Sequence, residues 1–84
     1  MQTLSTETSE SLTLAQHHRR AANHLDIAAL SHMEAAKLFE SGDQKAAELQ
    51  IDIARVNVLK AGLQVIEAGK KMLNSSGFPG TGLD

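Results

Sequence analysis

The chain has 84 residues, a formal net charge of −2, no cysteine and only two aromatic residues, Phe39 and Phe78. This length allows one small domain, which buries only about 60% of the surface that its unfolded chain exposes. The lack of cysteine excludes a disulfide framework and a thiolate metal site. The scattered basic residues exclude the dense basic face that nucleic-acid binding needs.

The N-terminal residues and the distribution of apolar residues bear on the cellular location of the protein. Residues 1–11 are rich in Ser, Thr and Glu and lack the basic stretch and apolar core of a secretion signal. No run of about 18 apolar residues occurs, and the bulky aromatics of a membrane-surface helix are missing. We therefore expect a cytoplasmic protein with no membrane partner.

In chain order, residues 1–12 are predicted to be disordered, because they are polar and have no periodicity. Thr13 and Gln16 have the spacing of a capping box, and no Gly or Pro follows before position 42, which predicts a helix over 13–41. A turn follows at 41–43, where Gly42 can take the left-handed C-cap conformation and either Ser41 or Asp43 can cap the next helix. That second helix is predicted over 44–73.

The short turn predicts an all-α fold, an antiparallel hairpin of two long helices over 13–74. Beyond it, residues 75–84 contain Ser, Gly and Pro and are predicted to form a flexible tail. The role of that tail stays open.

Apolar residues recur every seven positions in both helices, as in a coiled coil. In the first helix alanine fills two neighbouring rows, and in the second a row of alanine lies beside a row of larger residues. We predict the register of the two helices as follows: a residue of the first helix faces a residue of the second when their two sequence numbers add up to about 84 or 85. The predicted helix–helix seam consists of Ala22, Ala29, Ala36, Ile51, Ala54, Val58, Ala61, Val65 and Ala68.

The second helix has more apolar side chains than this seam can cover. About eight such side chains left in water would cost on the order of 10 kcal/mol, at ~1.5 kcal/mol each. The predicted interaction face comprises Leu49, Ile53, Val56, Leu59, Leu63 and Ile66. We predict a homodimer that forms a four-helix bundle, with the orientation of the arms left open. The competing interpretation is that a helical client protein covers this face.

Two glycines interrupt the second helix one heptad apart. Each costs about 1 kcal/mol relative to alanine in a helix interior. Gly62 and Gly69 either permit a very close helix contact, or Gly69 merely frays the helix end.

Four histidines invite a metal hypothesis, but no two of them have the i, i+3 or i, i+4 spacing of a helical metal site. The predicted facing rule sets His18 opposite Glu67 and His32 opposite Asp52. We interpret these as polar pairs that fix register, with no cofactor. The alternatives are metal half-sites completed by a two-fold mate, or a pH-sensitive oligomer.

Catalysis is not predicted. The serines cluster in the two tails, where no rigid base lies beside them, and there is no glycine-rich phosphate loop. We expect that the protein is not an enzyme.

Residues 35–48 resemble the corner between the two helices of a tetratricopeptide repeat, but such repeats have arms about half this length and need at least three units. Residues 15–70 resemble short His- and Ala-rich bacterial helical-hairpin proteins of unassigned function. In size and form the chain is also similar to small type III secretion co-chaperones. From the excess apolar surface we predict a non-catalytic protein-binding or scaffolding role; the alternative is a small chaperone or adaptor for a helical client, similar to a secretion co-chaperone.

Overall fold

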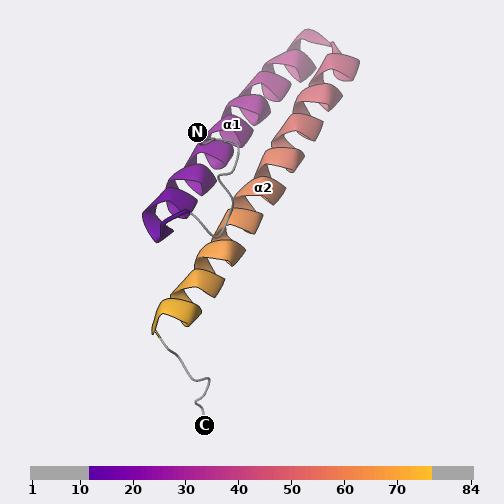
Figure 1. The fold of residues 1–84 in the computed structure, drawn as a ribbon. Coiled ribbons are helices and arrows are strands. Elements are labelled where there is room, and N and C mark those ends of the chain that lie inside the picture. Colours follow the sequence, from indigo (N-terminus) through magenta and orange to yellow (C-terminus); the bar gives the residue numbers. More distant parts are fainter. Residues whose placement is uncertain (1–11, 77–84) are drawn as a thin grey trace, which may run out of the picture.

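A computed structural model describes residues 12–76 of the chain. Two helices, α1 (Leu14–Ser41) and α2 (Gln44–Ser76), lie side by side and antiparallel as a hairpin (Figure 1). The predicted helical hairpin is therefore confirmed, although α2 continues past the predicted end at Leu73. Leu12, placed in the predicted disordered segment, is buried, with 4% of its surface exposed. The rest of that segment, residues 1–11, and residues 77–84 of the predicted tail lie outside the described residues.

The start of α1 is fixed by the capping box that the sequence predicts. Thr13 is extended, with φ −78° and ψ 165°. The Gln16 backbone N–H donates to Thr13 Oγ1 at 3.0 Å, and the Thr13 N–H donates to Gln16 Oε1 at 2.8 Å. Two backbone donors that the helix cannot satisfy itself are thus paired, which is typically worth about 1 kcal/mol.

The turn between the helices combines a C-cap with an N-cap. Gly42 is left-handed, with φ 88° and ψ 8°, and the Asp43 N–H donates back to the Leu38 carbonyl at 2.8 Å. This is a Schellman ending. Asp43 Oδ1 then accepts from the Ala46 N–H at 3.2 Å, whereas Ser41 Oγ donates to the Leu38 carbonyl. Of the two candidate caps, Asp43 is therefore the one that caps α2.

The register differs from the predicted one. His17 is hydrogen-bonded to Gln64 and His24 to Asn57, and the two residue numbers add up to 81 in both pairs. The prediction of 84 or 85 is therefore wrong. Each paired residue of α1 lies three or four positions nearer the N-terminus than predicted, which brings the row of His17 and His24 to face α2.

Alanine and polar residues make up the contact between the helices. Leu12 is the only buried hydrophobic residue larger than alanine within residues 12–76. The buried alanines are at most 6% exposed, and they lie beside three buried polar residues. The buried set, apart from Leu12, is Ala21, Ala28, Ala35, Ala47, Ala54, Ala61, Ala68, His17, Ser31 and Asn57. Side chains this small let two helices approach closely.

Five of the nine residues of the predicted seam therefore lie outside the contact between the helices. Ala54, Ala61 and Ala68 are buried against α1, as predicted. The prediction is wrong for a second group, all of which are exposed: Ala22, Ala29, Ala36, Val58 and Val65. Ile51 is half-buried. The register turns the neighbouring alanine row of α1 toward α2, about 100° around the helix from the predicted one.

Neither of the described helices combines the length and the apolar character that crossing a membrane requires.

Candidate interaction surfaces

Large apolar side chains cover the outside of the hairpin. Their exposed fractions run from 43% for Ile27 to 69% for Leu59. The exposed set is Leu25, Ile27, Leu30, Met33, Phe39, Leu49, Ile53, Val56, Val58, Leu59, Leu63, Val65, Ile66, Met72 and Leu73. A small hairpin with alanine inside and leucine, isoleucine and valine outside exposes much more apolar area than a monomeric protein usually does.

The heptad rows sort these side chains into two broad faces, one on either side of the helix–helix contact. In an antiparallel pair, the corresponding flanking rows of both helices lie on the same side. We call one side the apolar face. It consists of Ala15, His18, Ala22, Leu25, Ala29, His32, Ala36 and Phe39 on α1, and Glu48, Ile51, Arg55, Val58, Gly62, Val65, Gly69 and Met72 on α2.

We call the opposite side the mixed face, because apolar and charged side chains alternate on it. Its members are Gln16, Arg20, Asn23, Ile27, Leu30, Glu34, Lys37 and Ser41 on α1, and Ala46, Leu49, Ile53, Val56, Lys60, Leu63, Glu67 and Lys70 on α2. Four of the six residues of the predicted interaction face belong here: Leu49, Ile53, Val56 and Leu63. The other two, Leu59 and Ile66, lie on the back of α2. All six are exposed, as expected.

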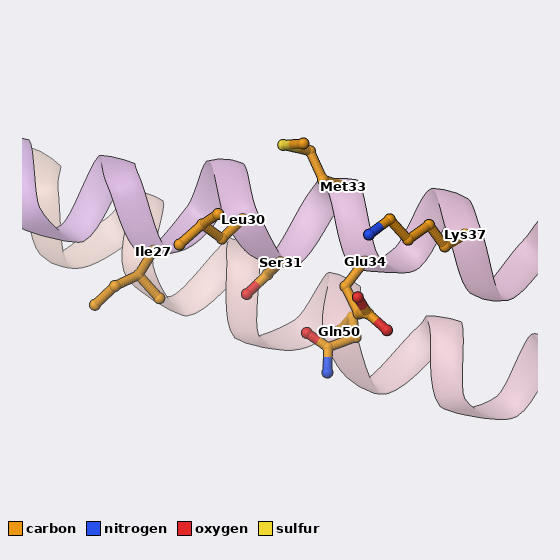
Figure 2. Close-up of a pocket in the computed structure, with 7 residues that line it drawn as sticks. All are labelled: Ile27, Leu30, Ser31, Met33, Glu34, Lys37 and Gln50. Atoms are coloured by element: carbon orange, nitrogen blue, oxygen red, sulfur yellow. The ribbon is translucent and has the colours of Figure 1, made fainter.

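An open groove of about 370 Å³ lies on the mixed face, toward the turn (Figure 2). Its lining residues are Ile27, Leu30, Ser31, Met33, Glu34, Lys37 and Gln50. Figure 2 shows Glu34 directed toward Gln50 on α2, whereas Met33 points away from α2. The groove thus has apolar walls with charged groups beside them.

Between the helices, two histidines are paired with amides. His17 is fully buried, and its Nδ1 lies 2.7 Å from Gln64 Oε1. An amide oxygen only accepts hydrogen bonds, so Nδ1 carries the hydrogen. The His24 Nδ1 lies 2.9 Å from Asn57 Oδ1, and Asn57 Nδ2 donates to the Ile53 carbonyl at 2.9 Å. That second bond orients the Asn57 amide, so its oxygen faces His24.

The sequence prediction missed these pairs. It chose His18 and His32, which are both exposed on the apolar face. A signal was present, because His17, His24 and Ser31 are spaced by seven, and so are Gln50, Asn57 and Gln64. A repeating polar row beside a repeating alanine row is what a close polar helix contact requires.

The predicted cross-helix pairs of His18 with Glu67 and of His32 with Asp52 are therefore wrong. Glu67 lies on the mixed face, where its Oε2 is 3.4 Å from Lys70 Nζ. Asp52 Oδ1 is 3.4 Å from Arg55 Nη1. Within residues 12–76, no group of three or more His, Asp or Glu residues could hold a metal ion. The candidate metal ligands His18, His32, Asp52 and Glu67 therefore do not form one group within the described residues.

Comparison with protein-family models, with curated proteins and with solved structures finds no match to this chain. The resemblance to His- and Ala-rich hairpin proteins thus stays a prediction. What the fold defines is a two-helix hairpin with apolar outer faces.

Proposed function

We propose that this chain is a non-catalytic protein–protein interaction or scaffolding module, and that two hairpins associate into a four-helix bundle in the cytoplasm. One observation carries the proposal. The large apolar side chains lie outside the hairpin, whereas alanine and hydrogen-bonded polar groups fill the contact between α1 and α2.

The magnitude of the exposed apolar surface supports association. Covering eight half-exposed aliphatic side chains at ~1.5 kcal/mol each is worth on the order of 10 kcal/mol. That equals the stability of a typical whole domain. The alanines between the helices bury little area per residue, so an isolated hairpin has few apolar contacts to offset the entropy of ordering.

The solution mass tests this proposal. One chain weighs 9.0 kDa. Sedimentation or light scattering at micromolar concentration is expected to give twice that mass, and the unfolding temperature is expected to rise with protein concentration. A well-folded monomer with a concentration-independent unfolding temperature would refute self-association.

A second candidate function is that of a small chaperone or adaptor for a helical client. The mixed face favours it, because the groove beside Ile27 and Leu30 has Glu34 and Lys37 at its rim. An amphipathic client helix could lay its apolar side there and meet charge at its edges. In that case the purified chain is unstable alone, and an amphipathic peptide raises its unfolding temperature.

A further inference from the structure

The two faces of the hairpin differ in charge, and this difference bears on which one takes a partner copy. On the apolar face the only charged side chains are Glu48 and Arg55, both on α2, while the corresponding rows of α1 have none within the described residues. The mixed face carries Arg20, Glu34, Lys37, Lys60, Glu67 and Lys70. The buried centres of protein interfaces are depleted of charge.

We infer that the second copy of this chain packs on the apolar face and leaves the mixed face in solvent. The inference rests on the proposed self-association and adds the surface that performs it. Because the same face is used by both copies, the contact is isologous and closes as a dimer.

The area of the apolar face suits a stable dimer. α1 has 28 residues, which is about 42 Å of helix at 1.5 Å per residue. Two helices side by side are about 20 Å wide. One face therefore offers about 800 Å² per copy, the size of a standard specific interface. A single face is therefore large enough for a specific dimer interface, and the charge pattern favours the apolar face over the mixed face as that interface.

The glycines of α2 supply a further argument. Gly62 and Gly69 both belong to the apolar face, and a Cβ added at either would meet no atom within 4 Å in the hairpin. The hairpin itself therefore has no packing need for glycine, although each costs about 1 kcal/mol in a helix interior. On α1 the same face is lined by Ala22, Ala29 and Ala36. Positions without bulk on both helices allow the helices of a second copy to approach closely.

Two matched arginine substitutions on α2 test this inference. Val58→Arg changes the apolar face and Leu63→Arg the mixed face, at side chains that are 48% and 60% exposed in the hairpin. Since both positions are exposed, circular dichroism should show the same helix content in both variants. We expect Val58→Arg to raise the dimer dissociation constant at least about 100-fold, because each copy then buries an unpaired charge. Leu63→Arg is expected to change it less than about 3-fold.

Gly62→Ala serves as the second variant. Alanine has a higher helix propensity than glycine, so this substitution does not destabilise α2 itself. If the apolar face is the contact, the added methyl group weakens dimerisation by about 10-fold even though the hairpin has room for it. Dissociation by Leu63→Arg but not by Val58→Arg or Gly62→Ala overturns the choice of face and leaves self-association standing. A wild-type chain that is monomeric at every concentration overturns both.

Discussion

Leucine in place of Gln64 tests whether the polar pairs between the helices stabilise the hairpin. His17 is fully buried, and its Nδ1–H donates to the Gln64 side chain. Gln64→Leu leaves this donor without that acceptor in a site that excludes water. A buried donor deprived of its partner costs about 1–3 kcal/mol.

Part of that loss is offset, because the half-buried leucine adds apolar contact worth up to about 1 kcal/mol. The expected net loss is about 1–2 kcal/mol, which lowers the unfolding temperature of a chain this small by about 4–16 °C. Thermal unfolding followed by circular dichroism measures it. All variants need the same protein concentration, since association would itself shift the midpoint.

Gln50→Leu is the matched control. Gln50 occupies the same row of α2 and is also half-buried, but its side chain makes no hydrogen bond within the described residues. Its replacement is expected to change stability by less than about 0.5 kcal/mol or to increase it. Adding His17→Leu to Gln64→Leu removes the Nδ1 donor that has lost the Gln64 acceptor, and we expect a coupling of about 0.5–3 kcal/mol between the two substitutions. The reasoning fails if Gln64→Leu is no more damaging than Gln50→Leu.

Further predictions concern the ends of the helices and the surface. Gly42→Ala should lower the free energy of unfolding in denaturant titrations by about 1–2 kcal/mol, because alanine resists a positive φ; an unchanged midpoint would contradict the Schellman ending. Thr13→Ala should cost about 1 kcal/mol and speed hydrogen exchange in the first turn of α1 only. Lys70→Ala should change stability by less than about 0.5 kcal/mol, because its ion pair with Glu67 lies on the mixed face and the Lys70 side chain is 66% exposed; a larger loss would show a role beyond that pair. A chelator should leave the unfolding temperature unchanged, whereas a fall that His18→Ala abolishes would revive the metal hypothesis.

The local features of this hairpin could be predicted from the sequence because each depends on neighbouring residues. The Thr13–Gln16 capping box, the left-handed Gly42 and the absence of Gly and Pro from residues 15–40 define where α1 begins and ends. Excess apolar surface was also predictable, because both helices have apolar side chains on more than one side and a single helix–helix contact covers only one side of each.

The register and the choice of contacting rows depended on tertiary structure. Alanine fills two adjacent rows of α1, and the alanine pattern alone does not distinguish the row of Ala21 from that of Ala22. The offset of α2 against α1 is seen in the pairs of His17 with Gln64 and of His24 with Asn57. That offset buries His17 and exposes Val58. A heptad pattern gives the rows of a helix, but the contact between two helices selects which of them become the core.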